Sequence, residues 1–346
     1  MSRRPLIPPP GGFRSIAVLR LSSLGDVVLT LPVVRALRAA WPGAKLHYWV
    51  KEEYADLLRF DPDVDHLRLL ERDARSLEDL VSMSAELEDC DLIVDLQGNS
   101  RTRVLTFRQR APVLRASSYR LRRAMWVHAR ALRPAAVPSA CARYAEALAP
   151  LGLAAEGAPR VVAGETAEAW ASEWMSAWRP AGVPVALCPG ALHPTKRWPE
   201  ARWCELDARI AAAGRPRIVF ATPPDRRALP AFAARIDADP AARWVMEPLP
   251  RVAALLSHCA AAVTHDSGLM HLAAARAVRV VAIFGSTSPV LGFAPAGEGH
   301  VVLCRDEPCQ PCTLHGRQTC PRGHFRCMTG IAPDEVAAAL ATVAGR

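Results

Sequence analysis

Short apolar runs that end in polar loops recur along the first half of the chain, and amphipathic helical patterns separate them. The runs that predict buried strands are residues 15–20, 46–50, 67–70, 91–96 and 112–116. Helical spacing predicts helices over residues 27–41, 77–88 and 140–151, the first with Pro32 near its first turn. Strands that alternate with helices are typical of a parallel sheet with crossover connections.

The same alternation begins again in the second half of the chain. Strands are predicted over residues 183–188, 216–221, 244–246, 260–264 and 278–284. Helices are predicted over residues 166–178, 201–213, 226–236, 251–259, 270–277 and 333–343. Residues 152–164, rich in Gly, Ala and Pro, form the predicted linker between the two series.

Two βα series joined by a linker predict an α/β protein with two Rossmann-like, doubly wound domains that face each other across a cleft. The expected boundaries are a flexible tail over 1–13, an N-terminal domain over 14–160 and a C-terminal domain over 165–330. Residues 331–346 form a terminal helix, for which a crossing back to the N-terminal domain is one option.

The charge of the chain indicates the kind of partner that it binds. The chain has 346 residues and a net charge of +9. No acidic residue occurs between Asp95 and Glu146, whereas arginines are frequent there. This favours an anionic partner such as a nucleic acid, a phospholipid surface or an acidic glycan. No apolar run suggests a membrane span and the tail lacks a signal-peptide core, so we expect a cytoplasmic protein.

Residues 264–274 run from the end of a predicted strand into the start of a predicted helix. Asp266 or Ser267 is placed to cap this helix, and Gly268 lets a ligand approach the backbone. A helix start just past a strand end is a natural phosphate site, because its free N–H groups and dipole favour an anion. An ordinary capped helix is the competing interpretation.

Two further loops follow strand ends. Residues 189–199 contain Gly190 and carry Lys196, which is placed to meet a phosphate. Asp26 follows the first strand, just before a helix, where a carboxylate can act as a general base on a sugar hydroxyl. A helix cap is the simpler interpretation of Asp26 taken alone.

Four motifs in order resemble glycosyltransferase family 9, the heptosyltransferases that add heptose to the lipopolysaccharide inner core. They are Arg20-Leu-Ser-Ser-Leu-Gly-Asp26, Asp95-Leu-Gln-Gly98, Lys196-Arg-Trp-Pro199, and Asp266-Ser-Gly-Leu-Met-His271 with Phe284-Gly-Ser-Thr-Ser-Pro289. The cysteine-rich segment looks closer to heptosyltransferase II than to I. The resemblance spans residues 14 to 345 and implies a GT-B fold with the nucleotide sugar in the C-terminal domain.

The resemblance also implies roles for individual residues. Asp26 matches the catalytic base, and Lys196 matches a lysine that contacts the donor phosphates and assists catalysis. The donor-binding positions it implies are Gly190, Lys196, Asp225, Asp266, Ser267, Gly268 and His271. The acceptor-binding positions, including the arginines expected to meet Kdo carboxylates and phosphates, are Ser23, Gly25, Gln97, Arg101, Arg120 and Arg123.

The expected activity is an inverting, metal-independent transfer of heptose from ADP-heptose to a Kdo-lipid A type acceptor. It would take place on the cytoplasmic face of the inner membrane, with the protein held there peripherally and with no cofactor. A GT-B enzyme with another donor or acceptor is the first alternative. A zinc-containing nucleic-acid-binding protein is the second alternative, although the arginine-rich stretch matches no known nucleic-acid-recognition motif.

Five cysteines crowd near the C-terminal end, in the pattern Cys304-x4-Cys309-x2-Cys312-x7-Cys320-x6-Cys327. With His315 and His324 they resemble a zinc site. A reduced, packed loop without metal is the preferred interpretation, because a single Cys-x-x-Cys lacks a matching second pair. We therefore expect no metal ligand in the chain.

Overall fold

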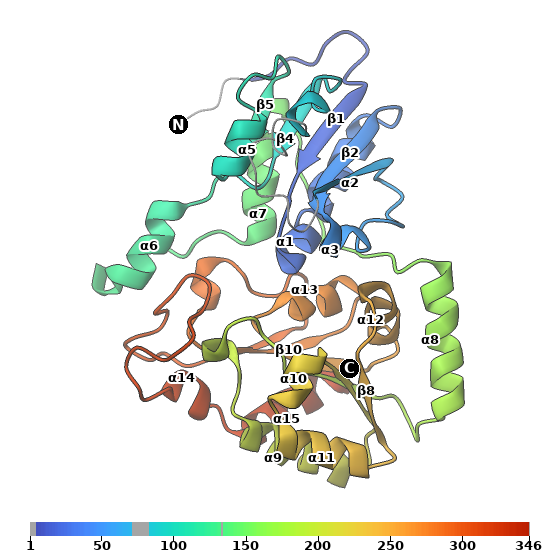
Figure 1. Ribbon diagram of the computed structural model, residues 1–346. Coiled ribbons are helices and arrows are strands. Elements are labelled where there is room, and N and C mark those ends of the chain that lie inside the picture. The colour runs from blue at the N-terminus through green and yellow to red at the C-terminus, as the bar shows by residue number, and fades with distance from the viewer. Residues whose placement is uncertain (1–4, 71–82, 133, 346) are drawn as a thin grey trace. The chain divides into compact units, whose positions relative to one another are not determined.

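The computed structural model describes residues 5–70, 83–132 and 134–345, so the first half of the helix predicted over 77–88 lies outside the described residues. The chain forms two compact units (Figure 1). The first combines Met1–Ser118 with Pro138–Val162, and the second combines Tyr119–Val137 with Ala163–Arg346. The sequence pattern assigns Tyr119–Val137 to the N-terminal domain, but the contacts of this segment group it with the second unit.

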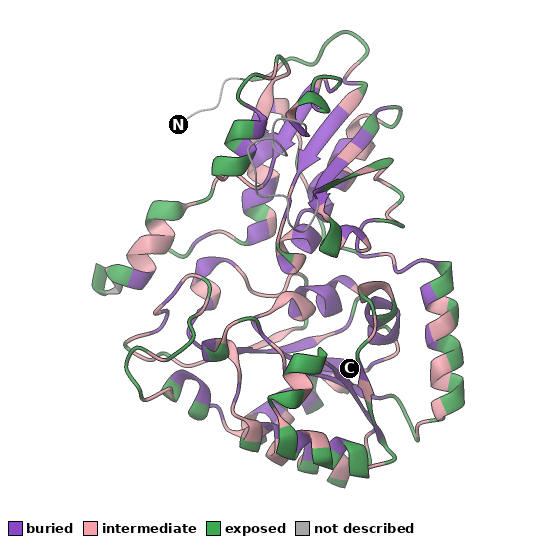
Figure 2. Ribbon diagram, viewed as in Figure 1, coloured by how far each residue is buried: buried purple, intermediate pink, exposed green. Residues whose placement is uncertain are grey.

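The first unit is built on a parallel sheet with strand order β3-β2-β1-β4-β5. Its strands are β1 (Ser15–Leu19), β2 (Lys45–Lys51), β3 (His66–Leu70), β4 (Leu92–Asp95) and β5 (Val113–Arg115). The apolar runs of β1 and β4 are buried on both faces, as Figure 2 shows. The strand order reverses between β1 and β4, so the loops after these two strands meet at the point where α/β sheets bind ligands.

The helices of this unit are α1 (Leu24–Leu29), α2 (Leu31–Ala40), α3 (Glu52–Ala55), α5 (Ser100–Leu105), α7 (Ala140–Ala145) and the 3-10 helix η2 (Glu146–Leu151). The prediction of a single helix over 27–41 is wrong, because the chain forms two helices there, α1 and α2, that meet at Thr30. Pro32 has no N–H to donate back, and the Thr30 hydroxyl donates to the Val27 carbonyl oxygen at 2.6 Å, which ends α1.

The second unit has a parallel sheet of order β11-β10-β9-β6-β7-β8. Its strands are β6 (Val185–Cys188), β7 (Arg217–Phe220), β8 (Ala242–Val245), β9 (Ala261–His265), β10 (Val280–Phe284) and β11 (Val301–Cys304). The sequence pattern misses β11, because this edge strand is short and only half-buried along its whole length. Here the order reverses between β6 and β9, which places the Lys196 and Asp266 loops side by side.

Helices cover both faces of this second sheet. The helices of the second unit are α6 (Arg120–His128), η1 (Arg130–Leu132), α8 (Glu165–Trp178), η3 (Pro194–Lys196), α9 (Glu200–Ala212), α10 (Pro223–Arg227), α11 (Pro230–Ala238), α12 (Leu249–Leu256), α13 (Gly268–Ala275), η4 (Pro289–Leu291), α14 (Arg326–Thr329) and α15 (Pro333–Ala344). The helix predicted over 226–236 is instead α10 and α11, separated at Pro230. The terminal helix α15 packs against α9, β9 and β10, within its own unit.

Candidate active site

Asp26 lies on the third residue of α1 in the first unit, and both of its carboxylate oxygens have partners. The Arg20 guanidinium lies 2.7 Å from Oδ2, and the Ser23 hydroxyl donates to Oδ2 at 3.1 Å. The Tyr144 hydroxyl of α7 donates to Oδ1 at 2.6 Å. Ser23 holds the N-cap position, and Asp26 completes a capping box because its Oδ2 also accepts from the Ser23 N–H at 3.5 Å, so the competing capping interpretation holds alongside these contacts.

These contacts set the charge state of Asp26. Burial raises the pKa of the carboxyl, but the positive charge of Arg20 and the hydrogen bonds from Tyr144 and Ser23 outweigh it, so the pKa is lowered overall. Asp26 is therefore a carboxylate at neutral pH. Its side chain is 18% exposed, which leaves one edge open to solvent.

The loop after β4 braces the loop that carries Asp26. Gln97 Oε1 accepts from the backbone N–H of Leu21 at 3.1 Å and of Ser22 at 3.4 Å. Asp95, fully buried at the end of β4, accepts from Gly98 N–H at 2.8 Å and pairs with Arg115. The amide oxygen of Gln97 is thus used to hold the loop that carries Asp26 in place.

Ser23 and Gly25, the other acceptor positions predicted in the Asp26 loop, differ in exposure. Ser23 is exposed and bonded to Asp26, whereas Gly25 is buried in α1. Ser23 is therefore the one that presents its side chain to solvent beside the carboxylate.

In the second unit, Lys196 and Asp266 meet at the carboxyl ends of β6 and β9. Lys196 Nζ lies 2.7 Å from Asp266 Oδ2 and donates to the Asp266 carbonyl oxygen at 3.1 Å. The Thr287 hydroxyl, from the loop after β10, donates to the same Oδ2 at 2.6 Å. Three loops that follow neighbouring strands therefore converge on one carboxylate.

This pairing changes the expected role of Asp266. Ser267 occupies the N-cap position of α13, and neither Asp266 nor Ser267 makes a side-chain cap hydrogen bond there. The expected side-chain cap is wrong, because the Asp266 carboxylate is bound by Lys196 and Thr287. The helix start at Gly268, with its N–H groups uncapped by a side chain, is the kind of terminus that favours an anion.

Gly190 and Asp225 lie against each other in the same unit. A Cβ built on Gly190 would lie 2.6 Å from Asp225 Oδ2, so the close approach requires glycine. Asp225 forms a capping box with Thr222 at the start of α10 and lies 3.4 Å from Arg197. The two predicted donor residues are thus brought together.

The remaining predicted residues do not form one cluster within either unit. His271 is buried on α13. Arg101 is exposed on α5 of the first unit, whereas Arg120 and Arg123 lie on α6, which groups with the second unit. The Arg123 guanidinium lies 5.1 Å from the centre of the Phe293 ring.

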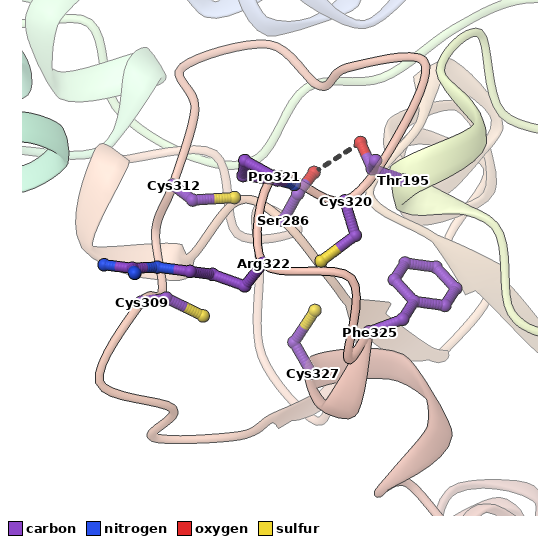
Figure 3. Close-up of a pocket in the computed structure, with 9 residues that line it drawn as sticks. All are labelled: Thr195, Ser286, Cys309, Cys312, Cys320, Pro321, Arg322, Phe325 and Cys327. Atoms are coloured by element: carbon purple, nitrogen blue, oxygen red, sulfur yellow. Dashed lines mark hydrogen bonds between the residues drawn. The ribbon is translucent and has the colours of Figure 1, made fainter.

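Four of the clustered cysteines, Cys309, Cys312, Cys320 and Cys327, line one small pocket of the second unit together with Thr195, Ser286, Pro321, Arg322 and Phe325 (Figure 3). Burial, followed by the neighbouring cysteines, raises the pKa of Cys327 to about 12, so this thiol stays protonated. Cys304 lies apart on β11, where Gln310 Nε2 lies 3.1 Å from its sulfur.

His324, one of the two histidines of the zinc-like pattern, lies near the cysteine pocket, with its Nε2 atom 3.6 Å from Cys309 Sγ. Across residues 5–70, 83–132 and 134–345, no group of three or more His, Cys, Asp or Glu side chains is arranged to hold a metal ion.

Hydrogen bonds tie this cysteine-rich loop to the Lys196 loop. Thr195, next to Lys196, bonds the Ser286 hydroxyl at 2.9 Å, as Figure 3 shows, and accepts from Arg317 N–H at 2.8 Å. Cys312 N–H donates to the Ser286 carbonyl oxygen at 3.0 Å. The loop therefore buttresses the residues that present Lys196.

Comparison with known proteins shows the family of the chain. The family described as glycosyltransferase family 9 (heptosyltransferase) matches residues 81–321. The chain belongs to glycosyltransferase family 9. A relative of this family, lipopolysaccharide heptosyltransferase 1 of Pseudomonas aeruginosa, is 29% identical over 88% of this chain and 87% of its own length.

Solved structures of glycosyltransferase family 9 share the fold. The family 9 enzyme from Veillonella parvula aligns with a TM-score of 0.79 at 21% identity, over 96% of this chain and 97% of that one. The ADP-heptose lipopolysaccharide heptosyltransferase II of E. coli aligns with a TM-score of 0.72 at 21% identity, over 95% and 98%. The predicted GT-B architecture of two parallel-sheet α/β domains is confirmed.

Three residues that contact predicted site residues within their own units carry no role in the sequence-based prediction. Arg20 and Thr287 lie inside the motifs quoted above, so their positions in the sequence could have indicated that they lie near the predicted site residues. No sequence feature indicates that Tyr144 lies near Asp26, because the two are 118 positions apart and Tyr144 belongs to no motif.

Proposed function

We propose that this protein transfers heptose from ADP-heptose to the inner core of lipopolysaccharide, with inversion at the anomeric carbon and without a metal ion. The single observation that carries the proposal is the convergence of Lys196, Thr287 and the start of α13 on Asp266. Family membership and the name of the Pseudomonas relative support the choice of sugar and acceptor.

The donor diphosphate is proposed to bind at the start of α13. The N–H groups there and the helix dipole favour an anion, and the Lys196 ammonium, which is paired with Asp266, lies beside them as a further donor to a phosphate. As the bond from the sugar to the diphosphate breaks, negative charge builds on the leaving oxygen, and fixed cationic and N–H groups stabilise it. Gly190 and Asp225 are the proposed contacts toward the nucleoside.

Asp26 is the proposed general base of the first unit. A carboxylate that is ionised at neutral pH can take the proton of an acceptor hydroxyl as that oxygen attacks the sugar. Ser23, Gly25, Gln97, Arg101, Arg120 and Arg123 remain the proposed acceptor contacts. The arginines suit an acceptor that carries carboxylates and phosphates.

Membrane association is proposed to be peripheral, on the cytoplasmic face of the inner membrane. Among the described residues no helix is both long and apolar enough to cross a bilayer. Leu121 on α6 and Leu132 on η1 are 77% and 69% exposed, and Arg120 is exposed beside them. Exposed apolar side chains next to basic ones suit an anionic lipid surface.

The direct test is transfer with purified protein, ADP-heptose and a truncated Kdo-lipid A acceptor, with the product's anomeric configuration determined by NMR. We expect an inverted product, full activity in EDTA, and loss of activity in Asp26→Asn. Retained activity in Asp26→Asn would disprove the assignment of the base. Turnover only with a different nucleotide sugar would replace ADP-heptose as the donor, and loss of activity in EDTA would disprove metal independence.

A further inference from the structure

The partners of the Asp26 carboxylate are divided unequally between its two oxygens. A carboxylate oxygen has two lone-pair positions for hydrogen bonds. Oδ2 receives Arg20 at 2.7 Å, the Ser23 hydroxyl at 3.1 Å and, more weakly, the Ser23 N–H at 3.5 Å, so both of its positions are used. Oδ1 receives Tyr144 alone among the described residues, at 2.6 Å, and one of its positions is left over.

Arg20 and Tyr144 also hold each other. The Arg20 guanidinium lies 5.3 Å from the centre of the Tyr144 ring, which is a cation–π contact, and it donates to the Leu96 carbonyl oxygen at 2.8 Å. Tyr144 is buried, with 5% of its surface exposed, on a helix that packs against α1 and α2. The plane of the Asp26 carboxylate is therefore fixed from both sides.

We propose that Tyr144 is a positioning residue that orients Asp26 so that Oδ1 is the atom that takes the acceptor proton. This inference rests on the proposed function of Asp26 as the base. In the step, the acceptor oxygen bonds to the anomeric carbon while the bond from that carbon to the diphosphate oxygen breaks. The bonding electron pair leaves with ADP, and the acceptor proton moves to Oδ1 of Asp26.

Tyr144 acts here as a hydrogen-bond donor and not as a second base. Burial raises the pKa of its phenol above the ordinary value, with the negative charge of Asp26 contributing further, so the hydroxyl keeps its proton. A neutral donor at 2.6 Å stabilises the ionised carboxylate without neutralising it. Arg20 supplies the compensating charge on the opposite oxygen.

The variant that tests this role is Tyr144→Phe, which keeps the ring under Arg20 and removes only the hydroxyl. We expect kcat to fall about 10-fold to 100-fold, less than the roughly 100-fold to 10,000-fold that a general base itself contributes, because Asp26 is still present. KM for ADP-heptose should stay within about twofold, because the donor residues belong to other elements. The acidic limb of the kcat–pH profile should move to higher pH, because the Asp26 carboxylate loses a donor to its charged form.

Tyr48→Phe is the matched control. Tyr48 is equally buried in the same unit, and its hydroxyl bonds the Thr30 hydroxyl at 2.6 Å instead of Asp26. It should leave the pH profile unchanged even if it lowers the melting temperature. A profile and kcat equal to wild type in Tyr144→Phe, or the same shift in Tyr48→Phe, would overturn the inference.

Asp26→Asn separates this inference from the proposed function. If Asp26→Asn is inactive while Tyr144→Phe behaves like wild type, Asp26 is still the base and only the role of Tyr144 is wrong. If Asp26→Asn is fully active, both fail. A carbon-13 NMR titration of the Asp26 carboxyl in wild type and Tyr144→Phe gives a readout that needs no turnover, and equal titration curves would also overturn the inference.

Discussion

Lys196 is bound twice by one residue, because its ammonium lies 2.7 Å from Asp266 Oδ2 and 3.1 Å from the Asp266 carbonyl oxygen. This pairing holds the cation at the start of α13 before any donor is present. A diphosphate that binds there meets a charge already in place, so little side-chain entropy is lost on binding.

Replacement of Lys196 by alanine should weaken ADP binding by about 10-fold to 100-fold, the range expected for loss of a charge-assisted hydrogen bond of about 1.5–3 kcal/mol. Titration calorimetry with ADP measures this directly. Lys45→Ala, at an exposed position of β2, should bind ADP like wild type. Equal affinities for Lys196→Ala and Lys45→Ala would exclude Lys196 from the phosphate site.

Asp26 should make the stability of the protein depend on pH. Its pKa lies below the ordinary value of 3.8, so the unfolded chain takes up the proton first as the pH falls. The stabilisation is therefore complete above that ordinary value and is lost as the pH falls through the lower folded pKa. Asp26→Asn should melt below wild type at pH 7.

The difference in melting temperature between wild type and Asp26→Asn should narrow below about pH 4, where the Asp26 carboxylate of the unfolded wild-type chain begins to be protonated while that of the folded chain stays ionised. Thermal denaturation at a series of pH values measures this. Asp56→Asn, in an exposed pair with Arg59, should show little difference at any pH. A gap for Asp26→Asn that stays constant into acid would contradict the lowered pKa.

A buried ion cluster in the second unit should matter more for stability than any exposed pair. Asp207 on α9 and Arg217 on β7 are each 1% exposed and 2.8 Å apart, and Arg217 also pairs with Asp239. Without Asp207, the buried Arg217 keeps only the partly exposed Asp239 as its carboxylate partner, so Asp207→Ala should lower the free energy of unfolding by about 3 kcal/mol, the lower end of the range for a broken buried pair. Urea denaturation followed by tryptophan fluorescence measures the loss.

The exposed pair of Arg209 and Asp334 provides the comparison for this cluster. Asp334 is 79% exposed, so solvent screens its interaction with Arg209. Asp334→Ala should have little effect on the urea midpoint. If Asp207→Ala were as mild, the buried cluster would not be a stabilising element of this unit.

Membrane binding should depend on the two exposed leucines near α6. Leu121→Ser combined with Leu132→Ser should reduce binding to vesicles that contain anionic lipid by about 10-fold, because the apolar area of both side chains no longer enters the lipid. Vesicle flotation measures the bound fraction. Val183→Ser, 61% exposed just before β6, serves as control. Equal binding by the double variant and wild type would exclude this surface.

Sequence patterns predicted the strands better than the helices. Every predicted strand has a counterpart, and fully buried strands such as β4 read as continuous apolar runs. The edge strand β11 was missed although its four residues, Val301–Cys304, are all apolar. Helix boundaries failed where proline removed a donor, as at Pro32 and Pro230, a break that helical periodicity does not register.

The candidate site residues also differ in how far the sequence could predict them. Lys196, Asp266 and Asp26 stand next to strand ends, so topology alone places them where ligands bind. Tyr144 has no such marker, since helix packing brings it to Asp26 from 118 positions away. The capping role expected for Asp266 failed because a local motif cannot reveal that Lys196, 70 positions away, occupies its carboxylate.

Gly190 and Asp225 limit the size of each other's side chain. The carboxylate of Asp225 is held by Thr222 at 2.6 Å and by Arg197 at 3.4 Å, so it cannot swing aside to admit a methyl group at position 190. A substitution at either position therefore changes which residues the other can accept. A larger residue at position 190 therefore has to be matched by a smaller one at position 225.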